Sequence, residues 1–311
     1  MNGWASADAM GSQAGRTFLV TGANSGLGFE TARALARSGA EVVLACRNQK
    51  KGDEALTRIR AESSEAKVSL LPLDLADLRS VREAATRFAS EHELLDGLVN
   101  NAGLMALPFS KTEDGFEMQI GTNHLGHFAL TGLLLPSLEK AKAPRVVTVT
   151  SLYHKRGKVD LADLFFEKRR YDKWVAYAQS KLANLLFAFE LQRRASKKKL
   201  ALLSLGAHPG YSATELQGKG PKAEGSSFLE GVMKIANAVM AQSQERGALP
   251  QLRALTDPAA QGGELYGPSG FQEVWGDAVR VQAVAAAHDE AAARGLWERS
   301  IELTKVDFGG L

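Results

Sequence analysis

"TGANSGLG", residues 21–28, joins two segments of different periodicity. Before it, "RTFLVTG" (16–22) is a short apolar run rich in β-formers, which indicates a buried strand. After it, apolar residues recur at helical spacing from Phe29 to Ala36, and Gly39 ends the pattern. A glycine-rich turn between a strand and a helix lets the backbone approach a pyrophosphate at the helix N-terminus, where free N–H groups and the dipole favour anions. We therefore predict a dinucleotide site here; the alternative is a purely structural turn.

Apolar runs alternate with amphipathic segments along most of the chain. Further strands are predicted at about 41–46, 67–75, 96–103, 145–151 and 200–210. Helices are predicted at about 49–62, 77–91, 113–140, 171–195, 228–240, 245–256 and 284–303. Strands that alternate with helices of this length form βαβ units around a parallel sheet. The predicted fold is therefore α/β, a doubly wound, Rossmann-type parallel sheet with helices on both faces.

We predict one domain over residues 16–311, preceded by an N-terminal arm at 1–15, because no linker or repeat divides the chain. The Gly/Ser/Lys-rich stretch "LQGKGPKAEGSS" (216–227) is interpreted as a mobile loop and not as a domain boundary. Trp4 is a candidate to dock the arm on the body.

Composition limits the class of protein. The 311 residues are 45% hydrophobic and 23% charged, which is ordinary for a globular protein. A net charge of +3 is too small to indicate a nucleic-acid surface, and the basic runs at 155–158, 167–170 and 196–199 are expected to be solvated. We expect no nucleic-acid partner.

The single cysteine, Cys46, excludes an intramolecular disulfide and favours a reducing compartment. The N-terminus lacks the basic start and apolar core of a signal peptide, and no apolar run approaches the ~18 residues of a membrane span. We expect a soluble, cytoplasmic protein with no membrane span. Cys46 itself is expected to be structural, although Arg47 beside it could make the thiol reactive.

The second predicted strand ends in "ACRN" (45–48). An NAD site places Asp or Glu at this point to bind the ribose 2′-hydroxyl, whereas an arginine suits a 2′-phosphate. Arg47 therefore favours NADP(H), unless it is only a surface arginine.

"YAQSK" (177–181) places a phenol and an ammonium four residues apart on a predicted helix. Residues i and i+4 lie on one helical face, so Tyr177 and Lys181 are expected to point into the same space. A free phenol has a pKa near 10 and is a poor base at neutral pH. An ammonium nearby stabilises the phenolate, and the pair can then exchange a proton with a carbonyl or an alcohol.

With these motifs the chain resembles the short-chain dehydrogenase/reductase family. The family's T-G-x-x-x-G-x-G, adenine-side D-L, N-N-A-G and P-G-x-x-x-T all occur in the family's order, together with Y-x-x-x-K. "ACRN", "NHLGHF" and "YAQSKLANLLF" are most similar to the branch that contains retinol dehydrogenases and WW-domain oxidoreductases. The resemblance covers roughly residues 16 to 270.

The resemblance implies roles for individual residues. The catalytic residues would be Asn123, Ser151, Tyr177 and Lys181. Tyr177 would be the general acid/base, Ser151 would bind the same substrate oxygen, and Asn123 would hold a water that links Lys181 to solvent. The residues that would bind NADP(H) are Gly22, Asn24, Ser25, Gly26, Leu27, Gly28, Arg47, Asn48, Asp74, Leu75, Asn101, Ala102, Gly103, Tyr177, Lys181, Pro209, Gly210 and Thr214.

Two features depart from the compact members of the family. Twenty-six positions separate Ser151 from Tyr177 instead of about a dozen, and His208 stands where many members have asparagine before Pro-Gly. The extra segment favours a monomer or homodimer over the compact members' tetramer.

The resemblance places three segments around the substrate: the insertion before Tyr177, the substrate loop at about 211–240, and within it the helix from Phe228. They contribute Phe165, Phe166, Trp174, Tyr211, Phe228, Leu229 and Met233. An apolar pocket favours apolar ligands, so the expected substrate is a lipophilic carbonyl or alcohol, similar to a retinoid, steroid or fatty aldehyde. The alternative is that these residues only pack the insertion onto the body.

The same motifs are compatible with functions other than an NADP(H)-dependent oxidoreductase. A non-catalytic NADP(H)-binding regulator of the same fold is the main alternative, although regulators usually lose the tyrosine or the lysine. An epimerase of the extended branch has a different glycine spacing and a larger C-terminal domain. His124 and His127 lie three apart on a predicted helix, but no carboxylate or cysteine accompanies them, so we expect packing or hydrogen bonding and no metal.

Overall fold

The computed structural model describes residues 3–211 and 243–311. Within them, eight strands form one sheet in the order β3-β2-β1-β4-β5-β6-β7-β8. The strands are β1 (Thr17–Thr21), β2 (Glu41–Cys46), β3 (Lys67–Pro72), β4 (Gly97–Asn100), β5 (Arg145–Val149), β6 (Leu203–Ala207), β7 (Leu265–Pro268) and β8 (Ala278–Val281). The reversal of order at β1 and β4 confirms the predicted doubly wound sheet.

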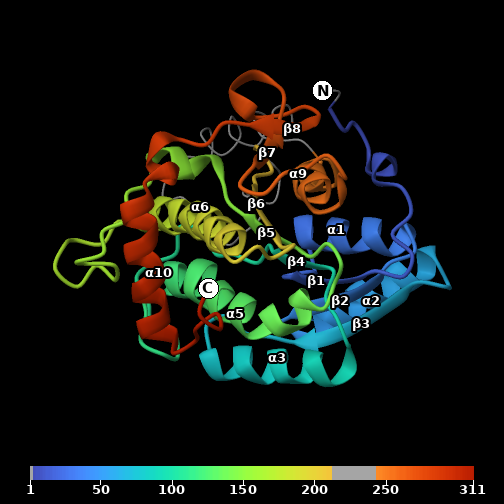
Figure 1. The fold of residues 1–311 in the computed structure, drawn as a ribbon, viewed down its shortest axis with the longest axis horizontal. Helices are drawn as coiled ribbons and strands as arrows, with labels where there is room; N and C mark the ends of the chain where they lie inside the picture. The colour runs from blue at the N-terminus through green and yellow to red at the C-terminus, as the bar shows by residue number, and fades with distance from the viewer. Residues whose placement is uncertain (1–2, 212–242) are drawn as a thin grey trace, which may run out of the picture.

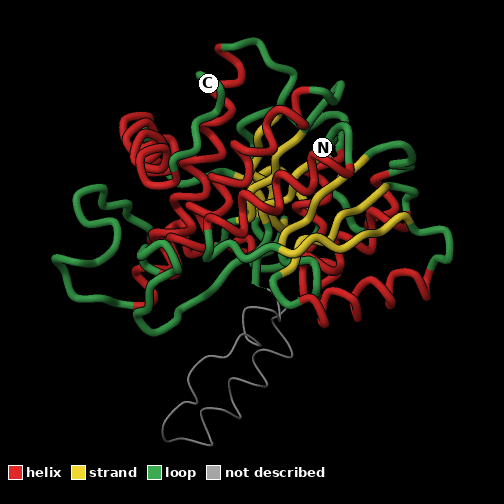
Figure 2. Tube along the Cα trace, turned by 90° about the horizontal axis from the view of Figure 1, so that it is seen from below, coloured by secondary structure: helices red, strands yellow, loops and turns green. Residues whose placement is uncertain are grey.

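Helices cover both faces of the sheet (Figure 1). The helices are α1 (Gly26–Arg37), α2 (Gln49–Glu62), α3 (Leu78–Glu91), α4 (Met118–Ile120), α5 (Gly126–Glu139), α6 (Lys173–Lys197), α9 (Gln244–Thr256) and α10 (Glu290–Thr304). Figure 2 shows the strands at the centre of the described chain, with helices around them.

The alternation of side chains along each strand divides the core into two layers. On β1, Phe18 and Val20 pack with α1, α2 and α9, while Leu19 packs with α3, α5 and α6 on the opposite face. All three side chains are fully buried. Successive residues of a strand point to opposite faces, so a strand covered on both sides must be apolar throughout, as "FLV" is.

Two predicted helices have different bounds in the structure. The helix predicted at 113–140 begins at Met118, because residues 111 and 117 form an isolated β-bridge and the Glu117 carboxylate caps the first turn. A π-helical turn, Gly121–Leu125, then interrupts it. The helix predicted at 284–303 begins at Glu290, where the Asp289 carboxylate accepts from the Ala292 N–H.

The sheet is parallel except at one edge. β8, which was not predicted, pairs antiparallel with β7, because the short connection between them can only form a hairpin. Trp4 of the N-terminal arm forms two 3.0 Å backbone hydrogen bonds with Ala278 of β8. The arm therefore covers the outer edge of the sheet, which would otherwise present unpaired N–H and C=O groups.

No helix among residues 3–211 and 243–311 is both long and apolar enough to cross a membrane. The predicted helix at 228–240 and nearly all of the predicted substrate loop lie outside the described residues.

Candidate active site

A cleft of about 1120 Å³ lies at the carboxyl ends of the central strands. Open parallel sheets bind ligands at this edge, where the strand order reverses. Most of the predicted cofactor residues line the cleft: Gly22, Asn24, Ser25, Gly26, Leu27, Arg47, Asn48, Asp74, Leu75, Asn101, Ala102, Gly103, Tyr177, Lys181 and Pro209. The structure thus brings together residues from six separate segments of the sequence.

The glycine-rich turn is shaped by close backbone contacts. Gly22 and Gly26 have positive φ angles of 67° and 59°, which favour glycine. A Cβ atom on Gly28 would lie 2.5 Å from both the Gly22 carbonyl oxygen and the Asn101 side-chain nitrogen. Gly28 therefore lies behind the cleft and lets the turn pack on the end of β4. This bare backbone at the start of α1 fits a dinucleotide pyrophosphate.

Thr21 joins the turn to the neighbouring strand. Its Oγ1 accepts from the backbone N–H groups of Asn101 and Ala102, each at 2.9 Å. The Asn101 side chain donates to the Thr21 carbonyl at 2.8 Å. The two segments that border the cleft on either side of the strand reversal are therefore held together by direct hydrogen bonds.

Three cationic side chains line the cleft at its α2 end. Arg47 is 68% exposed and its guanidinium lies 3.9 Å from the Asp74 carboxylate. Lys51 lies in the first turn of α2, and the Arg58 guanidinium stacks 4.0 Å from the centre of the Phe29 ring. Sequence reasoning found Arg47 but missed Lys51 and Arg58. A signal existed for Lys51, because a cation in the first turn of a helix opposes the helix dipole unless an anion binds there.

Tyr177 and Lys181 lie on one face of α6 and both line the cleft. Their side chains are buried, at 4% and 5% exposure, with the ammonium 5.7 Å from the centre of the phenol ring. The Lys181 ammonium also donates to the Val149 carbonyl at 3.4 Å. Ser151 lies two residues after the end of β5, is 1% exposed, and caps the short 3₁₀ turn Leu152–Arg156. The pair predicted from i, i+4 spacing is thus placed in one cavity.

Asn123 lies in the π-helical turn and is fully buried. Its side chain donates to the Leu104 carbonyl at 2.9 Å and to the Ser180 hydroxyl at 2.9 Å, and it accepts from the Leu104 N–H at 2.7 Å. A Cβ atom on Gly103 would lie 3.2 Å from the Lys181 ammonium and 3.3 Å from the Asn123 Oδ1. Gly103 therefore leaves the space in which Asn123 and Lys181 approach the cleft. The π-turn gives the Asn123 side chain a direction different from that in a regular α-helix. Such turns are frequent at functional sites.

His127 links the π-turn to the glycine-rich turn. Its Nδ1 hydrogen-bonds the Asn123 carbonyl at 3.0 Å, and its Nε2 hydrogen-bonds the Thr21 hydroxyl at 2.9 Å. His124 bonds instead to the Ser300 hydroxyl at 2.9 Å. The described residues contain no group of three or more His, Cys, Asp or Glu that could hold a metal ion. His124 and His127 both make hydrogen bonds inside the core, and the His124 ring packs near Phe128 and Phe187.

Burial lowers the pKa of His127 to about 4 and that of His124 to about 3, from 6.5. For His127, the bond to the Asn123 carbonyl opposes this shift and the Lys181 charge adds to it; for His124, the neighbouring His127 adds to it. Both rings are therefore neutral at physiological pH.

Acid should destabilise the protein through these histidines. Between pH 6.5 and about 4, the unfolded chain binds protons that the folded chain excludes. The free energy of unfolding should therefore fall as the pH is lowered, by up to about 1.4 kcal/mol per pH unit for each histidine. Urea unfolding at pH 5 and pH 7 measures this slope. His124→Gln should reduce it and His288→Gln, at an exposed site, should not; equal slopes in all three proteins would contradict the prediction.

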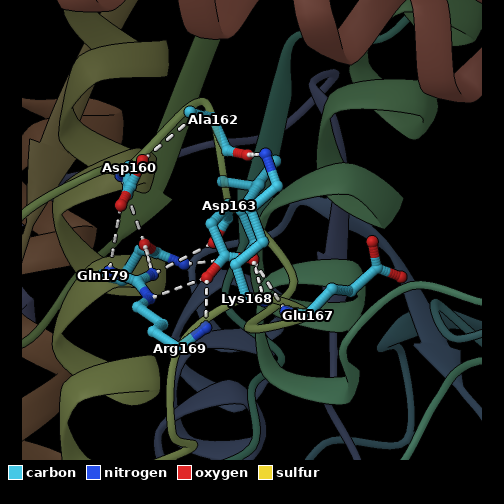
Figure 3. A network of polar contacts seen from close by, with 8 residues as sticks. Asp160, Ala162, Asp163, Glu167, Lys168, Arg169 and Gln179 are labelled. Carbon is cyan, nitrogen blue, oxygen red and sulfur yellow. Dashed lines mark hydrogen bonds and ion pairs between the residues drawn. The ribbon is translucent and has the colours of Figure 1, made fainter.

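A polar network anchors the insertion to α6 (Figure 3). The Asp163 carboxylate accepts from the backbone N–H groups of residues 167–169, and Arg169 forms ion pairs with Asp160 and Asp163. Arg169 also donates to the Gln179 side chain at 2.8 Å, and Gln179 donates to the Leu164 carbonyl at 2.9 Å. Arg169 is thus internally bonded, unlike the solvated charge expected from the basic run at 167–170. Gln179 lies two residues after Tyr177, so the insertion is fastened to the helix that carries Tyr177.

The aromatic residues of the insertion divide into two groups. Phe165 stacks on Phe116 and packs against the core, and Phe166 is buried under the Arg169 guanidinium, so the prediction that these two wall the substrate cleft is wrong. Trp174 is 40% exposed, stacks on Tyr153 at 5.1 Å, and lies edge-on to Tyr177 at 6.5 Å.

The remaining predicted residues lie around or beyond the cleft. Gly210 has a positive φ of 67° and follows Pro209 at the edge of the cleft. Thr214, Phe228, Leu229 and Met233 lie outside the described residues. Cys46 is 1% exposed, and burial raises the pKa of its thiol to about 11. Hydrogen bonds from the backbone of Ala23 and Asn24 lower this pKa by less than burial raises it. The high pKa supports a structural role.

Comparison with known proteins identifies the family. The family model described as short chain dehydrogenase matches residues 16–225. The chain belongs to the short-chain dehydrogenase family. Retinol dehydrogenase 13 of Homo sapiens is 41% identical over 296 residues, which cover 94% of this chain and 86% of the relative. The chain is therefore an oxidoreductase of the branch similar to retinol dehydrogenases, as the resemblance predicted.

Solved structures of short-chain dehydrogenases agree with the fold. An uncharacterised protein from Mycobacterium paratuberculosis is 44% identical, with a TM-score of 0.80 and 99% of both chains covered. A short chain dehydrogenase from Shigella flexneri, solved in complex with NADP, is 25% identical with a TM-score of 0.60, covering 81% of this chain and 96% of that one.

Proposed function

We propose that this short-chain dehydrogenase is an NADP(H)-dependent oxidoreductase that interconverts a lipophilic carbonyl and its alcohol, with Tyr177 as general acid/base. One observation carries the proposal: Tyr177 and Lys181 share a single cleft with a glycine-rich turn and a cationic end. The cleft extends from the Tyr177–Lys181 pair to the glycine-rich turn and the cationic end. A bound dinucleotide would need both, a proton-transfer pair at its nicotinamide and groups that bind its phosphates.

The cationic end supports NADP(H) over NAD(H). Arg47, Lys51 and Arg58 line this end, and the first residue after β2 is Arg47 instead of the acid that would bind a free ribose 2′-hydroxyl. Arg47 and Asp74 are both partly exposed, so their 3.9 Å ion pair is weak and leaves Arg47 available to a phosphate. The Shigella flexneri relative was solved with NADP, which is consistent with this assignment.

The bound nicotinamide would supply or accept the hydride, and the side chains move and stabilise the proton and the charge. In carbonyl reduction, the Tyr177 hydroxyl donates its proton to the substrate oxygen; in alcohol oxidation, the phenolate removes it. The Lys181 ammonium favours the phenolate, and Ser151 hydrogen-bonds the oxygen on which negative charge develops. Asn123, held by Leu104 and Ser180, lies next to Lys181 and would hold the water that returns the proton to solvent.

Apolar surroundings of the cleft support a lipophilic substrate. Leu104, Met105 and Leu107 line the cleft, and the exposed Trp174 ring stands beside Tyr177. The relatives named retinol dehydrogenase also support a lipophilic substrate.

Catalytic efficiency should rise with substrate chain length. Each CH₂ group buried against such a wall contributes about 0.8 kcal/mol, so a homologous series of aldehydes with NADPH should show an increase of up to about fourfold per added carbon. Steady-state kinetics over the series measures this. A flat or falling trend would remove the support for an apolar pocket.

The whole proposal is tested by a panel of aldehydes, ketones and alcohols with NADPH or NADP⁺. Turnover with a member of the panel is the expected result. Binding of NADPH by fluorescence with no turnover on any member would instead favour a non-catalytic regulator of the same fold.

A further inference from the structure

The loop between β7 and β8, residues 269–277, packs on the turn that carries Pro209 and Gly210. The Tyr211 N–H donates to the Val274 carbonyl at 2.9 Å. A Cβ atom on Gly210 would lie 2.5 Å from the same carbonyl oxygen, so no side chain fits at this contact. The loop lies beyond residue 225, the end of the matched family model, yet it contacts the residues that follow Pro209, which lines the cleft.

His208 is buried at the centre of this contact, and both of its ring nitrogens are bonded. The Gly210 N–H donates to Nδ1 at 3.2 Å, so Nδ1 carries no proton. The proton is therefore on Nε2, which donates to the Glu273 carboxylate at 3.0 Å. Burial lowers the pKa of His208, which agrees with a neutral ring in this arrangement.

Glu273 also bonds to the segment that follows Ser151. The Lys155 ammonium lies 3.0 Å from the same carboxylate oxygen that His208 contacts. Lys155 belongs to the 3₁₀ turn that Ser151 caps, and within this turn the His154 Nδ1 hydrogen-bonds the Ser151 carbonyl at 2.7 Å. Partial burial would raise the Glu273 pKa, but the bonds from His208 and Lys155 outweigh it and lower the pKa to about 2.

The backbone at Glu273 is in an unfavourable conformation. Gln272 and Glu273 have φ angles of 51° and 60°, in the left-handed region that residues other than glycine seldom adopt. Two consecutive residues of this kind persist only when surrounding contacts hold them, and such positions cluster at functional sites. The bonds of the Glu273 carboxylate hold this segment together with backbone hydrogen bonds, among them the one from the Glu273 N–H to the Gly270 carbonyl at 2.9 Å.

We propose that Glu273 is a positioning residue: with His208 and Lys155 it forms a clamp that fixes the Pro209–Gly210 turn relative to the Ser151 turn. The two turns follow the neighbouring strands β6 and β5, and Pro209 lines the same cleft as Tyr177. The expected effect of the clamp on catalysis rests on the proposed function. A shift of about 1 Å in such a segment can cost as much as 10²-fold in rate, because reacting groups must be held in a narrow range of geometry.

Glu273→Ala should open the clamp, and Glu273→Gln should keep much of it, because the amide oxygen still accepts from His208. We expect kcat to fall about tenfold in Glu273→Ala and about threefold or less in Glu273→Gln, with the Kd for NADPH little changed in either. Asp277→Ala is the matched control, since Asp277 lies on the same loop but pairs with the exposed Arg246. It should behave as the wild type.

A double-mutant cycle tests whether His208 acts through Glu273. His208→Asn keeps an acceptor for the Gly210 N–H but is too short to reach the carboxylate. The double variant His208→Asn/Glu273→Ala should then be no slower than the more impaired single variant, because both remove one shared contact. If the rate losses of the two single variants multiplied in the double variant, the proposal would be overturned.

Hydrogen–deuterium exchange tests the clamp without any substrate. In Glu273→Ala the amides of Gly210 and Tyr211 should exchange at least about tenfold faster than in the wild type and in Asp277→Ala, since local opening becomes easier. Unchanged exchange at these amides would overturn the clamp, whatever the activity. Faster exchange in an enzyme that turns over no substrate of the panel would support the clamp and reject the proposed function.

Discussion

Tyr177→Phe is expected to lower turnover by about 10²- to 10⁴-fold while the protein stays folded and binds NADPH. The substitution removes the proton that the phenol exchanges with the substrate oxygen, and general acid–base catalysis contributes a factor of this size. The ring stays in place, packed at 4% exposure against Tyr153 and Trp174, so the fold loses little. Turnover of the best substrate of the panel and NADPH fluorescence measure the two effects separately.

Tyr153→Phe is the matched control, because it removes a phenolic hydroxyl from a ring 5.5 Å from Tyr177 and leaves the stacking on Trp174 intact. It should retain near wild-type turnover. If Tyr177→Phe kept more than about a tenth of the wild-type rate, the acid would have to be another group, since a loss this small is below the general acid–base range.

Arg47→Asp is expected to weaken NADPH binding by about 10- to 100-fold and to leave NADH binding nearly unchanged. A charge-assisted hydrogen bond to a phosphate contributes roughly 1.5–3 kcal/mol, which corresponds to this range of affinity. The new carboxylate would also accept a hydrogen bond from a bare ribose, so NADH should not lose affinity. Fluorescence titration with both cofactors measures the ratio of the two Kd values.

Lys50→Asp provides the control for Arg47→Asp, because it makes the same change of charge three residues away, at an exposed position that does not line the cleft. A long-range electrostatic effect would weaken NADPH binding equally in both variants. Equal affinity of the wild type for NADPH and NADH would contradict the preference itself.

Contacts between distant segments were not predictable from the sequence. Glu273 is 65 residues from His208, and its role depends on β8 turning back antiparallel beside β7. Arg58 was missed because a surface helix normally carries such cations, and only the folded chain shows that it lines the cleft. The sequence also did not separate Phe165 and Phe166 from Trp174, because the insertion packs Phe165 partly buried against the core, buries Phe166 and exposes Trp174.

Features set by short-range geometry were predictable from the amino-acid sequence. A strand, a glycine-rich turn and a helix follow one another within about twenty residues, and this order predicts the dinucleotide turn. Tyr177 and Lys181 are one helical turn apart, and this spacing predicts a proton-transfer pair together with the other motifs of the family. Only the tertiary structure decided the π-turn at Asn123, the bounds of the helices around it, and the bonds from His127 and Glu273. Hydrophobic periodicity reports which face of a segment is buried, whereas these features depend on which polar groups meet inside the fold.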